Sequence, residues 1–320
     1  MEEKCAICKT NLDQKVLNVK ERIINKGDMF KYVKCSSCGA LSLIDIPKDM
    51  SVWYPSDYNP YTAANTRQAR WSNIINRLKF FHRKLLTEII IRQKNENRWY
   101  KVLDLGFDKL LKRLYGTRIK KIDKILDVGC ASGALLDNLF DMGWKGLTGI
   151  DLFVPKSSIR QTKWRFIKGE IFDISNEKFD CIIMNHSFEH MSNPVAVLNK
   201  VNDLLNDDGL CIIAVPLSQG PAWREYGADY VQIDAPRHLI LYTTESMKIL
   251  CQKTGFHINR TRYDSDEGIF YFSEAYKKTK KSHGEIMQSF KHTDEFSKIA
   301  MQSNRQNDGD EAIFYLRKVK

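Results

Sequence analysis

The feature that most constrains the fold is a regular alternation of short apolar segments with helix-like segments from residue 122 onward. Strands that alternate with helical segments predict βαβ units and therefore a parallel, doubly wound α/β sheet. A capped helix at 243–255 fits the same pattern. The predicted strands of this part of the chain lie at 124–130, 146–152, 164–170, 179–185 and 209–216, with strand-like runs at 257–263 and 312–319.

The turn after the first of these strands is the strongest chemical signal. Asp127, Gly129 and Gly133 form the pattern D-x-G-x-x-x-G, in which glycine lets a ligand approach the backbone closely. Neither a dinucleotide fingerprint nor a P-loop is complete here. Asp151 ends the next strand, where α/β nucleotide folds place the carboxylate that binds ribose hydroxyls. An ordinary βα turn is the alternative for either feature alone.

Together these segments resemble a known family. DVGCASG and GID resemble motif I and the acidic loop of class I S-adenosylmethionine (SAM)-dependent methyltransferases, with Ala131 in place of the middle glycine of GxGxG. Residues 179–216 resemble the fourth and fifth strands of that family. The resemblance covers about residues 120–260 and implies an α/β fold, a Rossmann-like seven-stranded methyltransferase sheet. It is specific for the cofactor SAM and not for the methyl acceptor.

The same resemblance implies a set of cofactor-binding residues. Asp127, Gly129 and Gly133 would face the methionine end of SAM, and Asp151 its ribose. Glu170 and Ile171, which follow the third strand, would lie near the adenine. The complete predicted set is Asp127, Gly129, Ala131, Gly133, Asp151, Glu170, Ile171 and Asn185.

Three candidate catalytic residues follow the fourth strand: His186, Glu189 and His190. Ligands of doubly wound folds bind at the carboxyl ends of the strands. A histidine there could accept a proton from a hydroxyl or a carbon acid during methyl transfer. In the alternative interpretation, Glu189 and His190 only cap the next helix.

The segment Asp234–His238 offers a second candidate group, and its PRHL element recurs in a bacterial methyltransferase subgroup that the chain resembles. Arg237 could bind a carboxylate or phosphate of the substrate. His238 could act as the catalytic base. The alternative is a structural turn held by an Asp234–Arg237 pair.

Two CxxC pairs near the N-terminus predict a metal site. Cys5, Cys8, Cys35 and Cys38 have the spacing C-x2-C-x26-C-x2-C, which is typical of tetrahedral Zn²⁺ on two tight knuckles. Two disulfides are the alternative, which a reducing compartment disfavours. A closed four-cysteine site predicts a structural and not a catalytic zinc ion, in a small zinc-ribbon-like module.

A linker joins this module to the α/β part. It begins with the turn-rich segment 54–61, in which Tyr54 and Tyr58 would cover the substrate or simply pack the linker. A basic helical stretch follows, and 67–121 holds sixteen Lys and Arg against four Asp and Glu. This charge fits nucleic acid, an anionic membrane surface, a phosphorylated substrate or a solvated helix face. The predicted regions are 1–46 (zinc module), 47–121 (linker and basic helices), 122–275 (SAM-binding core) and 276–320 (polar segment and closing strand).

The predicted function is methyl transfer from SAM to a small molecule, for example a sugar nucleotide or a phosphorylated or lipid-linked glycan precursor. The first alternative is an RNA methyltransferase that binds RNA through the zinc module and the basic helices. A degenerate fold used only for binding is the second. The sequence contains neither an apolar run long enough for a membrane helix nor a signal peptide, so we expect a cytoplasmic protein.

Overall fold

The computed structural model describes residues 4–13, 15–55, 113–154, 163–279 and 281–320. The chain divides into two compact units. The first unit contains residues 1–53, 184–202 and 213–320, and the second contains 54–183 and 203–212.

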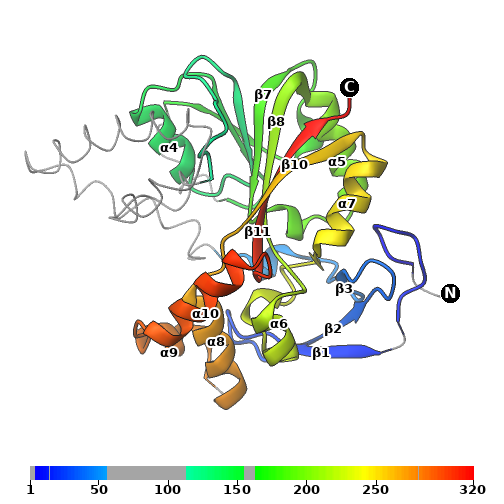
Figure 1. Ribbon diagram of the computed structural model, residues 1–320, viewed down its shortest axis with the longest axis vertical. Helices are drawn as coiled ribbons and strands as arrows, with labels where there is room; N and C mark the ends of the chain where they lie inside the picture. Colours follow the sequence, from blue (N-terminus) through cyan, green and yellow to red (C-terminus); the bar gives the residue numbers. More distant parts are fainter. Residues whose placement is uncertain (1–3, 14, 56–112, 155–162, 280) are drawn as a thin grey trace, which may run out of the picture. The chain divides into compact units, whose positions relative to one another are not determined.

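Seven strands form the larger sheet, in the order β10-β11-β8-β7-β4-β5-β6 (Figure 1). The pairs β4–β5 and β5–β6 are parallel, whereas β10 and β11 are antiparallel. The predicted seven-stranded α/β sheet is therefore confirmed. The strands are β4 (Ile125–Val128), β5 (Leu147–Asp151), β6 (Arg165–Lys168), β7 (Phe179–Asn185), β8 (Leu205–Pro216), β10 (Phe256–Tyr263) and β11 (Glu311–Lys318).

Within the second unit, β4 and β5 are buried along their whole length. This burial explains their continuous apolar sequence, because central parallel strands are covered on both faces. Helix α4 (Ala134–Asp141) follows the turn after β4 and buries Leu135, Leu136 and Leu139. The 3-10 turn η5 (Ile171–Asp173) follows β6.

Within the first unit, a smaller sheet has the order β1-β2-β3-β9. Its strands are β1 (Val16–Lys20), β2 (Met29–Lys34), β3 (Leu41–Leu43) and β9 (Ile240–Leu241). The antiparallel partner of Leu41 in β3 is Leu241 in β9. The N-terminal sheet thus takes its fourth strand from a segment some 200 residues later in the chain.

The stretch after residue 276, expected to be polar before a closing strand, contains helices. Figure 1 shows α8 (Glu267–Lys278), α9 (His283–Gln288) and α10 (Asp294–Arg305) side by side. Helix α10 buries only Ala300 and Ser303, so its sequence is mostly polar although it is helical. The first unit also holds η1 (Ser51–Trp53), η6 (Phe188–His190), most of α5 (Pro194–Leu204), α6 (Pro221–Tyr226), η7 (Gly227–Asp229), η8 (Val231–Ile233) and α7 (Thr244–Lys253).

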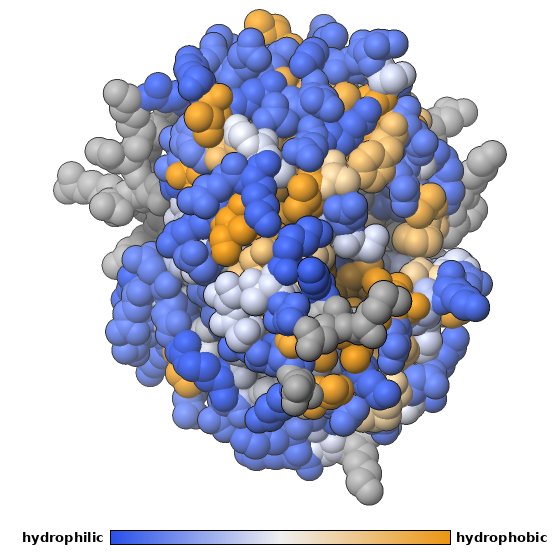
Figure 2. Space-filling model, turned by 90° about the vertical axis from the view of Figure 1, so that its right-hand side faces the viewer, coloured by the Kyte–Doolittle hydropathy of each residue, from blue (hydrophilic) through white to orange (hydrophobic). Residues whose placement is uncertain are grey.

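Among the described residues, no helix has the length and apolar character needed to cross a bilayer. The face drawn in Figure 2 is mostly hydrophilic, with hydrophobic residues in small groups between hydrophilic ones. Small exposed apolar areas of this kind are ordinary on a protein surface.

Candidate functional site

The turn after β4 has the backbone of a tight ligand-binding turn. Gly129 and Gly133 adopt φ angles of 74° and 78°, in the left-handed region that glycine tolerates. A Cβ at Gly133 would lie 2.0 Å from the Trp164 ring, so the residue has no room for a side chain. Ala131 also has a positive φ, 46°. Alanine thus occupies the middle-glycine position at a backbone cost of about 1–2 kcal/mol.

Asp151, the predicted ribose ligand, holds this turn together. Its Oδ2 accepts a hydrogen bond from the amide of Ala131 at 2.9 Å. Its Oδ1 accepts from the amides of Phe153 and Val154 at 2.9 and 2.8 Å. A carboxylate offers about four acceptor sites, so these three bonds leave capacity for a ligand hydroxyl.

Asp127 lies on β4 and is almost completely buried. Burial, and then the negative charge of Asp151, raise the pKa of its carboxyl to about 7, although Arg113 lowers it. Near neutral pH the Asp127 side chain is therefore poised between a hydrogen-bond donor and an acceptor.

The remaining predicted cofactor residues lie at strand ends. Glu170 follows β6 with an exposed side chain, and Ile171 beside it is buried. Asn185 ends β7, in the first unit, and its buried Oδ1 has no hydrogen-bond partner among the described residues. An unsatisfied buried amide oxygen costs free energy, which a donor on a ligand would recover.

The first unit brings the predicted catalytic side chains together. His186, directly after β7, adopts a φ of 49°. Its Nδ1 lies 3.4 Å from Oε1 of Glu189, and its Nε2 lies 3.1 Å from Oε1 of Glu311. The His186 ring therefore lies between two carboxylates. A non-glycine residue with a positive φ beside ionisable groups is a common feature of functional sites.

Glu189 and His190 lie on η6 and meet His238. Nε2 of His238 is 3.8 Å from Oε1 of Glu189. The ring centroids of His190 and His238 are 4.7 Å apart. Glu189 and His190 contact His186, His238 and the carbonyl of Arg237. The first turn of α5 is instead capped by Asn193, whose Oδ1 accepts from the amide of Ala196 at 3.1 Å.

The charges of this cluster follow from its burial. Burial alone raises the pKa of Glu189, but the contact with His186 and the charges of His238 and His190 lower it to about 2. Burial, and then the nearby His190, lower the pKa of His238 to about 4, against the opposing effect of Asp234. At neutral pH Glu189 is therefore ionised and His238 is neutral.

Arg237 does not lie where a substrate ligand was expected, because its side chain is completely buried. Nε and Nη2 donate to the carboxylate of Asp234, and Nη1 donates to the carbonyl of Trp53 at 3.2 Å. Oε1 of Glu21 is 3.8 Å from Nη2. The structure thus contains the turn held by an Asp234–Arg237 pair, the alternative considered for this segment.

Tyr54, in the second unit, stacks on Phe153 with ring centroids 4.4 Å apart. Tyr58 and most of the basic stretch 67–121 lie outside the described residues. The Tyr54 ring therefore packs against a residue of its own unit.

The four N-terminal cysteines converge. Sγ of Cys5 lies 3.6 Å from Sγ of Cys38, and Sγ of Cys8 lies 3.4 Å from Sγ of Cys35. All four sulfurs lie within 4.8 Å of one another, and all four are free thiols. Sulfurs around one tetrahedral zinc ion are about 3.8 Å apart, since each Zn–S bond is about 2.3 Å. The donor set and its spacing therefore fit Zn²⁺, and the alternative of two disulfides is not what these four residues show.

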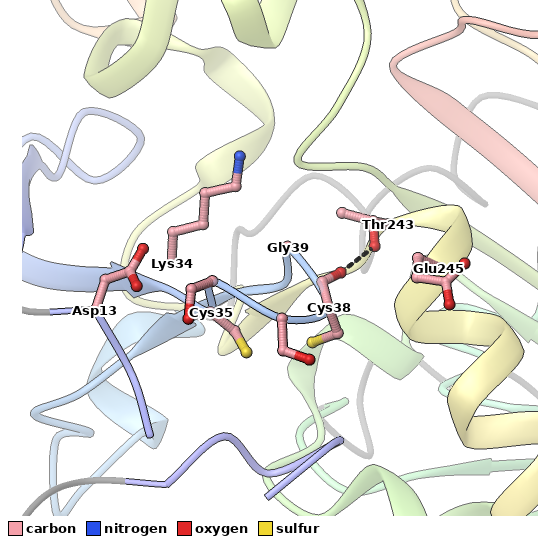
Figure 3. A pocket seen from close by; sticks show the side chains of 9 residues that line it. Asp13, Lys34, Cys35, Cys38, Gly39, Thr243 and Glu245 are labelled. Atoms are coloured by element: carbon pink, nitrogen blue, oxygen red, sulfur yellow. Dashed lines mark hydrogen bonds between the residues drawn. The ribbon is translucent and has the colours of Figure 1, made fainter. Parts of the chain in front are cut away.

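An open cleft of about 470 Å³ adjoins the second cysteine knuckle (Figure 3). Thr243, the N-cap of α7, donates through Oγ1 to the carbonyl of Cys38 at 2.6 Å. Lys253, at the other end of α7, donates to the carbonyl of Ile7 on the first knuckle at 2.6 Å. Both knuckles are thus attached to α7.

Sequence reasoning missed Glu311 and Gln232. Glu311 begins β11, 125 residues after its partner His186, and Gln232 accepts from Nδ1 of His238 through its carbonyl at 2.7 Å. No local pattern signals either contact. Both arise only when the strands and turns of the first unit pack.

The methyltransferase domain family matches the chain over residues 92–260, more than half of its length. The chain belongs to this family. The matched range includes the turn after β4, Asp151 and the His186–His190 segment. The predicted relationship to SAM-dependent methyltransferases is therefore confirmed at the level of the family.

Curated relatives are more distant. The chain is 25% identical over 122 residues to a ubiquinone biosynthesis O-methyltransferase of Psychrobacter cryohalolentis, covering 34% of this chain and 47% of that protein. It is 28% identical over 125 residues to the protein of the same name from Glaesserella parasuis, covering 34% and 52%. The chain spans about half the length of these relatives.

Solved structures include similar chains. A SAM-dependent methyltransferase from Mesorhizobium loti has a TM-score of 0.40 at 12% identity, covering 62% of this chain and 94% of that one. A cyclopropane synthase from Mycobacterium tuberculosis has a TM-score of 0.41 at 18% identity, covering 63% and 80%.

Proposed function

We propose that the chain transfers the methyl group of SAM to a small-molecule acceptor. The observation that carries this proposal is the turn after β4, in which Gly129 and Gly133 open the backbone and Asp151 fixes it. Family membership supports the choice of cofactor. When bound, SAM supplies the electrophilic methyl group. Asp127, Gly129, Ala131, Gly133, Asp151, Glu170, Ile171 and Asn185 remain the predicted residues that would hold it.

We assign proton removal from the acceptor to His186. Its side chain is 32% exposed, against 8% for His238 and none for Glu189. When His186 gains a proton, both ring nitrogens carry hydrogen, and both face carboxylates, those of Glu189 and Glu311. This arrangement stabilises the imidazolium that proton transfer creates. Glu189 and His238 are buried beside it, and half-buried His190 contacts His238, so these three residues support the cluster.

A kinetic comparison tests this role. His186→Ala should lower kcat by about 10²–10⁴-fold, as expected for the loss of a general base, with the affinity for SAM unchanged. His257→Ala, which removes an exposed histidine of β10, should leave both values as they are. If His186→Ala weakened SAM binding by the same factor as it lowered kcat, the assignment of proton removal to His186 would be wrong.

A hydroxyl group is the acceptor that we favour. The curated relatives are named O-methyltransferases, which favours a hydroxyl acceptor. A sugar nucleotide or a glycan precursor, the acceptor expected from the sequence, also carries hydroxyls. A zinc ion held by Cys5, Cys8, Cys35 and Cys38 would have a structural role, attaching the N-terminal module to α7.

Mass spectrometry identifies the acceptor. The full chain is incubated with methyl-labelled SAM and a cell extract that has been separated into small molecules, lipids and RNA. The proposal expects the label in the small-molecule or lipid fraction. Label in RNA alone would overturn it and favour the alternative in which the basic stretch 67–121 binds RNA.

A further inference from the structure

The buried carboxylate of Glu189 has an unusual environment. Its side chain has no exposed surface, and neither oxygen accepts a hydrogen bond from any residue that the structure describes. An ionised carboxylate removed from water costs several kcal/mol unless charge and hydrogen bonds compensate it. The nearest imidazole nitrogens, of His186 and His238, lie 3.4 and 3.8 Å from Oε1 without forming a hydrogen bond, so a bound cation would compensate this carboxylate.

The two neighbouring imidazoles are oriented by backbone carbonyls. Nδ1 of His190 contacts the carbonyl of Arg237 at 2.8 Å, and Nδ1 of His238 contacts the carbonyl of Gln232 at 2.7 Å. A carbonyl oxygen only accepts, so each Nδ1 carries the hydrogen. In the neutral ring the lone pair is then on Nε2. Metal-binding histidines are oriented in this same way by a partner on the other ring nitrogen.

Possible metal-ligand atoms of the three side chains converge. Nε2 of His238 lies 3.8 Å from Oε1 of Glu189, too far for a hydrogen bond. One ligand atom from each of Glu189, His190 and His238 lies within 4.8 Å of the other two. A nitrogen lone pair and a carboxylate oxygen that face each other without a hydrogen repel, and a cation between them turns this repulsion into attraction.

We propose that Glu189, His190 and His238 bind a divalent transition-metal cation such as Zn²⁺. Two imidazoles and one carboxylate are a donor set that such ions favour. Ligand atoms at about 2.0–2.2 Å from one tetrahedral ion lie roughly 3.4 Å apart, so the side chains need to move inward by about 1 Å or less. The site is separate from the four cysteines, which supply only sulfur.

The chemical use of this site rests on the proposed methyl transfer. Three protein ligands leave a fourth position on zinc, which takes water or a substrate oxygen. An acceptor hydroxyl bound there would lose its proton more easily, because the ion stabilises the oxygen anion. His186, which contacts Glu189 at 3.4 Å, lies next to the metal ligands and can take up that proton.

The test is a calorimetric titration of Zn²⁺ into the full chain after its four-cysteine site has received one equivalent. One further equivalent should bind. Glu189→Gln and His238→Gln should each weaken this second binding at least about 100-fold, since losing even an orienting partner of a ligand costs 10–100-fold. His257→Gln removes an exposed histidine elsewhere in the same unit and should leave the binding unchanged.

Cobalt substitution gives a readout that does not depend on the folding of variants. The first equivalent of Co²⁺ should show thiolate-to-metal charge transfer, and the second should add a spectrum of nitrogen and oxygen ligands without that band. Failure of the wild-type chain to bind a second equivalent would overturn the proposal. So would a second equivalent bound by thiolates, or equally tight binding in both variants. Methyl transfer is not measured here, so either result leaves the proposed function to its own test.

Discussion

The amide of Ala131 donates a hydrogen bond to Oδ2 of Asp151 at 2.9 Å. This bond joins the turn after β4 to the end of β5 across 20 residues of sequence. It connects the two features on which the cofactor prediction rests. The turn after β4 and the end of β5 therefore support each other, and a substitution in either should affect the conformation of both.

Replacement of Asp151 should weaken SAM binding. Asp151→Ala removes the acceptor of three backbone amides and the predicted ribose ligand. We expect the affinity, measured by calorimetry, to fall about 10–100-fold or more, the value of one hydrogen bond to a charged group. Asp151→Asn keeps one acceptor oxygen and should lose less. Asp294→Asn, at a surface carboxylate that is 86% exposed, is the control. Unchanged affinity in Asp151→Ala would show that the ribose assignment is wrong.

Ala131→Gly should stabilise the protein. Ala131 pays for a φ of 46° that glycine adopts without a Cβ clash. Because glycine also gains entropy in the unfolded chain, we expect a net increase of only about 0.5–1 kcal/mol in the free energy of unfolding. Denaturant titration measures it, with Ala131→Val expected to destabilise. A loss of stability in the glycine variant would contradict the strained geometry.

Asp127 should make stability depend on pH. Its pKa rises from 3.8 to about 7 on folding, so the folded state binds more protons between these values. The resulting stability is fully present below about pH 4 and is lost as the pH rises through 7, by an amount on the order of 2–4 kcal/mol. Asp127→Asn should reduce this slope in unfolding experiments at several pH values. An equal slope in the variant would show that Asp127 does not titrate in this range.

Metal analysis tests the four-cysteine site. Cys8→Ser and Cys35→Ser should each lose one equivalent of zinc and unfold at a lower temperature, because structural zinc contributes directly to folding. Cys251→Ala, at a buried cysteine outside the cluster, should keep that equivalent. Retention of all zinc by the Cys8 and Cys35 variants would exclude these residues as ligands.

Local patterns predicted the parts of the molecule that local physics determines. The buried strands β4 and β5, the glycine turn between β4 and α4, the capped helix α7 and the cysteine knuckles all follow from short segments. The Asp234–His238 segment shows the limit of such patterns. An Arg three residues after an Asp serves equally well as a substrate ligand or a buried ion pair, and only burial distinguishes the two.

Contacts between distant segments had no local signal. The pairing of β3 with β9, the contact of Glu311 with His186 and the packing of α10 against α8 depend on how the first unit packs. Three of the predicted catalytic residues, His186, Glu189 and His190, lie close together because they belong to one short segment after β7. His238 joined them through tertiary packing alone.

Transfer of a labelled methyl group from SAM tests the central claim most directly. Wild-type protein and Asp151→Ala are incubated with labelled SAM and the small-molecule and lipid fractions of a cell extract, and product label is counted together with S-adenosylhomocysteine. We expect equal amounts of both products with the wild type and a loss of both with the variant. SAM bound by the wild-type chain, with no label transferred to any fraction, would contradict it.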